Sequence, residues 1–125
     1  MLRECHRVVK PGGHIAGYVI HTPGGLSAAD ERRASELGPD AVIGPALPED
    51  LVRQAGFSRV VRKDVTRQFK ATVEAFRRAA RQWEAELRAE QGDEEYTAGC
   101  ERGKTMLIGI REGLLRRSLV TAIRS

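Results

Sequence analysis

The stretch Leu2-Arg-Glu-Cys-His-Arg-Val-Val-Lys-Pro-Gly-Gly-His-Ile-Ala-Gly-Tyr-Val-Ile20 decides the fold of this chain. Apolar residues recur at helical spacing as far as Val9, and Pro11 prevents the helix from continuing. Gly12-Gly13 then allows a tight turn, and residues 14–22 are apolar on both faces, which favours a strand that is covered on both sides. The stretch therefore predicts a helix, a turn and a buried strand of an α/β protein. The expected apolar face of the helix consists of Leu2, Cys5, Val8 and Val9.

The rest of the chain continues this alternation of helices and strands. We expect a short helix from Ser27 to Glu36, a helix over 49–55 after Pro48, a strand over 59–65, long helices over 66–91 and 93–112, and a closing strand over 114–123. The first long helix carries an apolar residue at every third or fourth position, and this stripe should cover a sheet or a partner helix. The stripe consists of Phe69, Val73, Phe76, Ala80, Trp83 and Leu87.

Length and composition are those of a single globular domain. The chain has 125 residues, of which 41% are hydrophobic and 30% are charged. No apolar run approaches the roughly 20 residues that span a bilayer. The first ten residues carry charges where a secretory signal should be apolar, so we expect a cytoplasmic protein without membrane contact. In that compartment Cys5 and Cys100 should remain thiols.

The basic net charge of the chain does not indicate a nucleic-acid partner. The net charge is +4, from 21 basic and 17 acidic residues. The densest group of arginines lies on the first long helix, where glutamates alternate with them. Mixed charge of this kind is typical of a solvated helix face. A basic helical nucleic-acid binder is therefore the weakest alternative.

No motif in the sequence marks a catalytic, cofactor-binding or metal-binding site. Residues 98–105 satisfy a relaxed phosphate-loop pattern, but Ala98 replaces its first glycine and no buried strand precedes it. Neither Gly12-Gly13 nor Gly24-Gly25 has the G-x-G spacing of a dinucleotide-binding turn. The histidines and cysteines lack the paired spacing of a zinc site, and no serine stands in a nucleophile elbow. We therefore predict no catalytic, cofactor-binding or metal-binding residue in this chain.

Two motifs resemble a known family. Leu2-Arg-Glu-Cys-His-Arg-Val-Val-Lys-Pro-Gly-Gly13 precedes the first expected strand, and Leu51-Val-Arg-Gln-Ala-Gly-Phe57 precedes the second. Both resemble segments of the class I S-adenosylmethionine-dependent methyltransferases, especially the small-molecule, methyltransferase type 11-like kind, in which they lead into the fifth and sixth strands. Val9 replaces a usual leucine, and the two long helices over 66–112 replace a connection that is often short in the family. The chain thus resembles the C-terminal half of that fold.

The resemblance implies a three-stranded mixed α/β sheet, packed with helices, as part of a Rossmann-like fold. Residues 15–20 would form strand 5, residues 59–65 strand 6 and residues 118–123 strand 7, in the family order 5-7-6. Together, residues 1–125 would make one partial methyltransferase domain. Residues 23–47 would form a lid-like insertion. Strand 5 would lack its family neighbour, strand 4, and an apolar edge of this kind invites pairing with another chain.

The resemblance also implies methyl transfer from S-adenosylmethionine to a small-molecule acceptor. The family's cofactor motifs correspond to no residue here, so we expect this fragment of the family fold not to bind S-adenosylmethionine or be active alone. Ligands of such sheets lie beyond the carboxyl ends of the strands, which makes Tyr18, His21 and Thr22 candidate substrate-binding residues. His21 would be a base or a substrate contact, with a plain loop histidine as the alternative reading.

A second hypothesis comes from a different class of function. The chain would be a non-catalytic interaction module that pairs through the free edge of strand 5. Its partner would be a second copy of itself or a separate N-terminal half.

Overall fold

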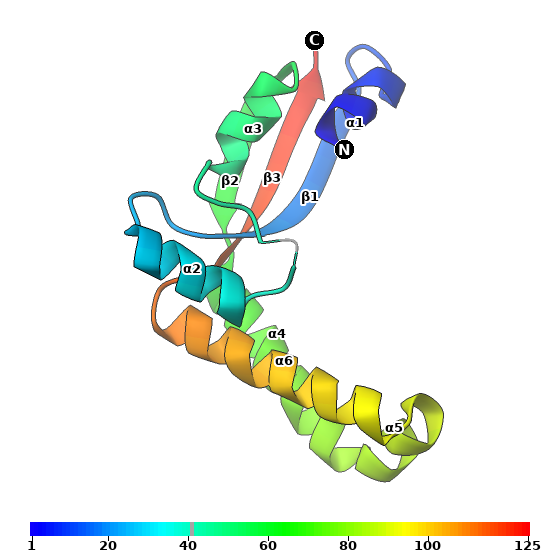
Figure 1. Ribbon diagram of the computed structural model, residues 1–125. Helices are drawn as coiled ribbons and strands as arrows, with labels where there is room; N and C mark the ends of the chain where they lie inside the picture. Colours follow the sequence, from blue (N-terminus) through cyan, green and yellow to red (C-terminus); the bar gives the residue numbers. More distant parts are fainter. Residues whose placement is uncertain (41) are drawn as a thin grey trace.

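The computed structural model describes residues 1–40 and 42–125 of the chain. Figure 1 shows two helices, α2 and α3, between β1 and β2, and a group of helices between β2 and the last strand. Ala41, within the predicted insertion 23–47, lies outside the described residues. The elements are α1 (Leu2–Val8), β1 (His14–His21), α2 (Ala28–Leu37), α3 (Pro48–Gln54), β2 (Phe57–Asp64), α4 (Thr66–Gln82), α5 (Glu84–Gln91), α6 (Asp93–Arg111) and β3 (Arg116–Arg124).

The sheet has the strand order β1-β3-β2, and both pairs are antiparallel. This arrangement confirms the predicted order 5-7-6, with the last strand of the chain between the other two. Tyr18 lies opposite Leu119 in one pair, and Val61 lies opposite Thr121 in the other. The register of β2 shifts between Ser58 and Val61, where Arg59 has a positive φ of 49°. One extra residue at such a bulge bends the strand without ending its pairing.

The interpretation of β1 as a strand covered on both faces is wrong for the described part of the chain. β1 is an edge strand of this sheet. Its Tyr18 side chain is 61% exposed, whereas Val19 packs into the core on the opposite face. The apolar pattern correctly predicts a strand at β1. Apolar residues on both faces of a strand are fully buried only where other elements cover both faces.

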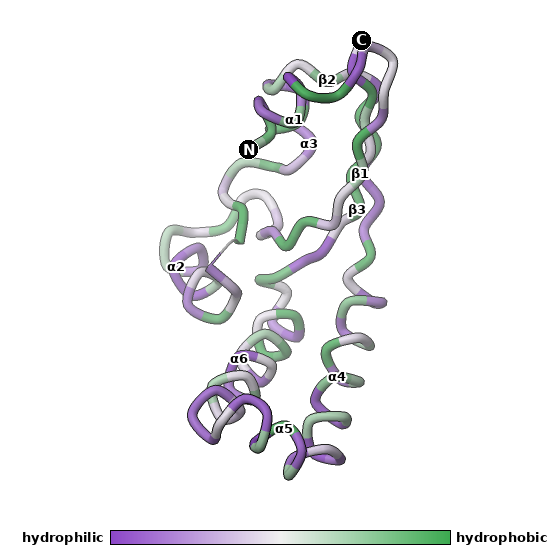
Figure 2. The backbone as a smooth tube through the Cα atoms, turned by 90° about the vertical axis from the view of Figure 1, so that its right-hand side faces the viewer, coloured by the Kyte–Doolittle hydropathy of each residue, from purple (hydrophilic) through white to green (hydrophobic). Residues whose placement is uncertain are grey.

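One face of the sheet packs against α1 and α3. Figure 2 shows both helices on the same side of the strands. The cluster between them contains Val52, Phe57, Val120 and Ala122, with partly buried Leu2, Cys5, Ile15 and Val19 around it. The predicted apolar face of α1 is therefore correct for Leu2 and Cys5. It is wrong for Val8, which is 64% exposed because α1 ends there and the chain turns away toward Pro11.

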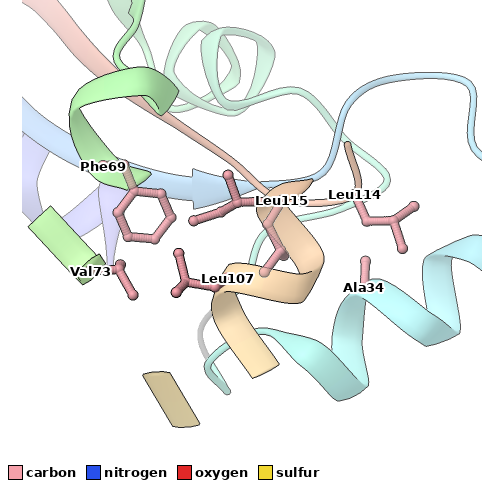
Figure 3. Close-up of a cluster of buried hydrophobic side chains, with 7 residues drawn as sticks. Ala34, Phe69, Val73, Leu107, Leu114 and Leu115 are labelled. Carbon is pink, nitrogen blue, oxygen red and sulfur yellow. The ribbon is translucent and has the colours of Figure 1, made fainter. Parts of the chain in front are cut away.

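A second core lies beyond one end of the sheet, between α2, α4 and α6. Figure 3 shows its side chains converging from these helices and from the segment that leads into β3. The cluster contains Ala34, Phe69, Val73, Leu107, Ile110, Leu114 and Leu115. At its rim, Arg33 of α2 donates two hydrogen bonds of 2.8 Å to the carboxylate of Glu112, just after α6. This forked ion pair holds α2 beside α6.

The single helix expected over 66–91 is divided at Trp83 into α4 and α5. Trp83 has φ −109° and ψ 27°, which leaves the helical region. In a continuous helix the carbonyl of Ala80 would accept from the amide four residues later. Here the hydroxyl of Tyr96, on α6, donates to that carbonyl at 2.8 Å instead. The break is thus stabilised by a side chain from the next helix, which the sequence pattern of residues 66–91 does not reveal.

The turn after α1 is attached to the end of β3. The Gly12 amide donates to the Arg124 carbonyl at 2.6 Å, and the Arg124 amide donates to the Gly13 carbonyl at 2.9 Å. Gly12 has φ 79°, which a residue with a side chain rarely adopts. A Cβ atom on Gly13 would lie 2.7 Å from Cγ1 of Val9 and 2.8 Å from the Lys10 carbonyl oxygen. Both glycines are therefore required by the geometry of the turn.

We expect Gly13→Ala to lower the free energy of unfolding by about 1–3 kcal/mol, because the added methyl group collides with backbone that cannot easily move. Gly17→Ala is the matched control, since a Cβ atom there meets no atom within 4 Å. The control should leave stability unchanged or raise it by up to about 1 kcal/mol, because alanine restricts the unfolded chain and Gly17 has no positive φ. Urea denaturation followed by circular dichroism measures both, and equal stability of the two variants would contradict the assigned role of Gly13.

Candidate functional site

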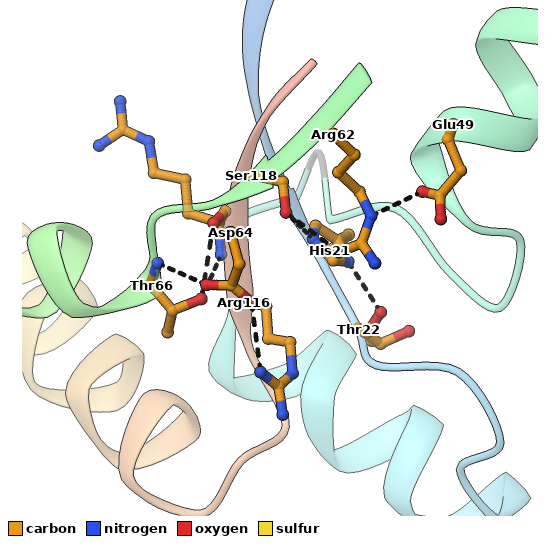
Figure 4. A network of polar contacts seen from close by, with 9 residues as sticks. His21, Thr22, Glu49, Arg62, Asp64, Thr66, Arg116 and Ser118 are labelled. Carbon is orange, nitrogen blue, oxygen red and sulfur yellow. Dashed lines mark hydrogen bonds and ion pairs between the residues drawn. The ribbon is translucent and has the colours of Figure 1, made fainter. Parts of the chain in front are cut away.

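Polar side chains gather at one end of the sheet, where β1 and β2 end and β3 begins. Because β3 is antiparallel to both neighbours, its first residues lie beside the last residues of β1 and β2. His21 is paired with Arg116, and Asp64 with Ser118. Figure 4 shows the resulting network of hydrogen bonds and ion pairs. This end of the sheet is the place where the sequence predicted the substrate site.

His21 lies at the centre of this network and is 1% exposed. Its Nδ1 lies 2.9 Å from the Thr22 carbonyl oxygen, and its Nε2 lies 2.8 Å from Oγ of Ser118. A carbonyl oxygen can only accept, so Nδ1 carries a proton and donates it to Thr22. The Ser118 hydroxyl, which can donate or accept, is the partner of Nε2. Both ring nitrogens therefore have protein partners, and the role of His21 as a base or substrate contact stays a prediction.

The network continues from Ser118 to α3. Arg62 donates to Oγ of Ser118 at 3.3 Å, and its Nε lies 2.9 Å from Oε2 of Glu49. Glu49 is the better buried partner, with 16% of its side chain exposed against 32% for Arg62. The chain of contacts from Glu49 through Arg62 and Ser118 to His21 thus fixes the end of the sheet against α3. The sequence reasoning missed Arg62 and Ser118, because each lies far along the chain from His21.

Thr22 is also buried, and it connects β1 with the predicted insertion. Its Oγ1 donates to Glu31 of α2 at 3.3 Å, and its amide donates to the Ile43 carbonyl at 3.0 Å. The Ile43 amide in turn donates to the Ile20 carbonyl at 3.0 Å. These bonds place residues 42–43 of the insertion alongside the end of β1, on its outer edge.

Asp64 holds the junction between β2 and α4. Its Oδ1 accepts from the Thr66 amide at 2.8 Å, and its Oδ2 accepts from Arg116 at 3.3 Å. Partial burial acts to raise the pKa of the Asp64 carboxyl, but the hydrogen bonds from Thr66 and Arg116 outweigh it and hold the pKa below its ordinary value. The ionised carboxylate therefore belongs to the folded state.

Tyr18, the third predicted site residue, lies on the opposite face of the sheet from His21. Strand residues alternate between faces, so Tyr18 and Ile20 face the side where α4 begins. The guanidinium carbon of Arg117 lies 4.2 Å from the centre of the Tyr18 ring and 5.5 Å from that of Phe69. The structure therefore brings His21 and Thr22 together in a buried network and separates Tyr18 from them.

On the Tyr18 side, an apolar groove of about 960 Å³ extends from the sheet along α4, α5 and α6. Phe76 and Trp83 line it and are 71% and 51% exposed. The expectation that the apolar stripe of α4 is covered by a sheet or helix is therefore wrong for these two residues. The physical reason lies on α6, which presents Gly99 and Gly103 to the groove where larger side chains would be needed to cover the stripe.

Residues 1–40 and 42–125 contain no group of three or more histidine, cysteine, aspartate or glutamate side chains placed to hold a metal ion. Within the same residues, no helix has the length and apolar content required to cross a membrane.

Comparison with solved structures identifies the fold. The chain is similar over 98% of its length to phosphoethanolamine N-methyltransferase 2 of Haemonchus contortus, in complex with phosphomonomethylethanolamine and S-adenosylhomocysteine, with a TM-score of 0.77 and 19% identity. It is similar over 99% to a putative sarcosine dimethylglycine methyltransferase of Galdieria sulphuraria, with a TM-score of 0.80 and 15% identity. A cyclopropane synthase of Mycobacterium tuberculosis matches 98% of the chain with a TM-score of 0.72 and 16% identity.

The chain spans 29%, 46% and 48% of the length of these three proteins, so it corresponds to half of their chains or less. No family model and no curated protein matches the sequence. These likenesses confirm the predicted fold, a three-stranded part of a Rossmann-like α/β fold packed with helices.

We expect Asp64→Ala to lower the free energy of unfolding at pH 7 by about 1 kcal/mol, the usual contribution of a carboxylate that accepts from a helix N-terminus. Because the folded-state pKa of Asp64 is lowered, its contribution is present above its unfolded pKa of about 3.9 and is lost as pH falls through the folded-state value. The difference between parent and variant should therefore persist at pH 5 and shrink below pH 3.

Urea denaturation at these pH values measures the difference. Asp40→Ala is the control, since Asp40 is exposed and should show no such pH dependence. A difference for Asp64→Ala that stays constant from pH 7 to pH 2 would contradict the assigned ionisation.

Proposed function

We propose that these 125 residues form the acceptor-side part of an S-adenosylmethionine-dependent methyltransferase. The observation that carries the proposal is the likeness of fold, which extends over 98–99% of the chain in neighbours that are methyltransferases by name. One neighbour holds both an S-adenosylmethionine product and a small phosphorylated amine in its complex. The acceptor of this chain would likewise be a small molecule.

The residues present do not fit the cofactor. The glycine turn at the start of β1 is the best candidate for a cradle of backbone amides, but those amides already have partners. The Gly12 amide donates to the Arg124 carbonyl, and the Gly13 amide donates to the Lys10 carbonyl at 2.8 Å. We therefore propose that S-adenosylmethionine binds to a separate part of the complete fold, and that this chain alone is inactive.

The contribution of this chain would be to position the acceptor. Methyl transfer from a sulfonium needs two aligned and desolvated reactants but no covalent intermediate with the protein, which agrees with the absence of a nucleophile motif in the sequence. Tyr18 would contact the acceptor directly, because its ring is exposed beside the groove. His21 and Thr22 would not touch the acceptor. They would fix the end of β1 and residues 42–43 of the lid-like insertion.

The proposal predicts that the 125-residue chain does not bind S-adenosylmethionine. Isothermal titration calorimetry with S-adenosylmethionine and S-adenosylhomocysteine should give no saturable heat at millimolar ligand. A polypeptide extended by the coding sequence before Met1 is the matched comparison and should bind with one-to-one stoichiometry. Saturable binding of S-adenosylmethionine to the 125 residues would contradict the proposal that the cofactor binds to a separate part of the fold. Lack of binding by the extended polypeptide would contradict the methyltransferase proposal itself.

A second candidate function, a non-catalytic interaction module, is favoured by the outer edge of β1. Residues 14–19 of this edge have no strand partner within the described part of the chain, and β1 is the more apolar of the two edge strands, which both have eight residues. Unpaired backbone groups on an edge strand are a template for pairing with another chain. The partner would be a second copy or a separate N-terminal half.

If this second function holds, the chain should self-associate in a reversible, concentration-dependent way. Size-exclusion chromatography with light scattering, from about 10 μM to 1 mM, should show a shift from monomer to dimer. A chain that remains a monomer at the highest concentration would contradict self-pairing through β1.

A further inference from the structure

We propose that the apolar groove binds an amphipathic anion, a long-chain carboxylate, with its head at Arg117 and its chain along α4 toward Trp83. The identification of this ligand as the methyl acceptor rests on the proposed function. The binding site itself is argued from the lining of the groove.

The interior of the groove suits an extended apolar chain. Its volume of about 960 Å³ lies at the upper end of the range of about 300–1,000 Å³ that is usual for small-molecule sites. Apolar side chains line it from the sheet to the far end of the helices: Ile20, Phe69, Phe76, Trp83, Leu87 and Met106. Burial of exposed aromatic rings such as Phe76 and Trp83 by a ligand makes the free energy of binding more favourable, because it removes apolar surface from water.

The charges around the groove all have one sign. Four arginines line it, Arg77, Arg81, Arg102 and Arg117, and its described lining contains no aspartate or glutamate. Arg102 is ion-paired with Glu95 at 2.8 Å. Within residues 1–40 and 42–125, no ion pair of 4.0 Å or less joins a carboxylate to the other three. A surface that is apolar along its length and cationic at its borders complements an amphipathic anion.

Arg117 is the arginine best placed to receive the head group. It belongs to β3, at the sheet end of the groove, and its guanidinium is held against the rings of Tyr18 and Phe69. Stacking of this kind restrains the side chain while leaving its donors available for a planar carboxylate. Arg77 and Arg81 also border a smaller cleft of about 210 Å³ that contains Glu74, so their charges are shared with that cleft. The carboxylate is therefore assigned to Arg117.

Trp83 supplies a direct measure of binding, because it is the only tryptophan in the chain and lines the groove. We would titrate the 125-residue protein with octanoate, decanoate and dodecanoate below their micelle concentrations and follow tryptophan fluorescence. We expect saturable changes, with affinity increasing about two- to fourfold for each added methylene, the upper value being that of full burial. Decyltrimethylammonium, a cation of equal chain length, should bind at least tenfold more weakly than decanoate.

Substitutions locate the two ends of the ligand. Arg117→Gln should weaken decanoate binding about tenfold, since it removes one charge-assisted contact, and should not weaken binding of the ammonium probe, since it removes a like charge. Arg78→Gln is the matched control, because Arg78 lies on the same α4 helix as Arg77 but does not line the groove. Phe76→Ser should weaken all chain lengths, whereas Val8→Ser, at another exposed apolar residue, should have no effect.

Three results would overturn the proposal. They are the absence of a saturable signal, equal binding of the cationic and anionic probes, and unchanged binding in both Arg117→Gln and Phe76→Ser. A dimer that decanoate does not dissociate, together with no binding, would show that a second copy fills the groove. Binding without methyl transfer in the extended polypeptide would leave the site in place and contradict only its role as an acceptor site.

Discussion

The pairing of β3 with both β1 and β2 is the interaction on which the rest of the structure depends. β3 is the last strand of the chain, yet it lies in the middle of the sheet, so β1 and β2 are joined within the sheet only through it. Its Val120 and Ala122 are buried beneath α1 and α3. Its end at Arg124 is bonded to the turn at Gly12-Gly13. The turn after the first helix and the end of the last strand are thus held together.

The antiparallel direction of β3 also determines what meets at the other end. A parallel central strand would bring its carboxyl end to His21 and Asp64, whereas the antiparallel strand brings its first residues, Arg116 and Ser118. Arg116 helps to hold the Asp64 carboxylate in its ionised form, and Ser118 is hydrogen-bonded to Nε2 of His21. The polar network therefore depends on chain direction as much as on residue type.

Local signals in the sequence predicted most of the elements but not the contacts between them. Pro11 ends a helix, and Gly56 adopts a φ of 101° after α3, so each boundary could be predicted from one residue's backbone preferences. The partner of His21 is 97 residues away, and no local pattern connects the two. The division of the long helix at Trp83 was equally hidden, because it contains neither proline nor glycine and is stabilised by Tyr96 from the next helix.

This division explains why a groove exists on a face that the sequence pattern assigned to the core. An uninterrupted helix would carry Leu87 farther along the direction of α4. The break at Trp83 instead lets α5 pack against α6, and the apolar stripe becomes one wall of the groove. The groove and the polar network then meet in neighbouring residues of one strand. Arg117 faces the groove and Ser118 faces His21, as the alternation of a strand requires. A ligand at Arg117 would therefore contact the strand that holds the buried network in place, although it touches no member of that network.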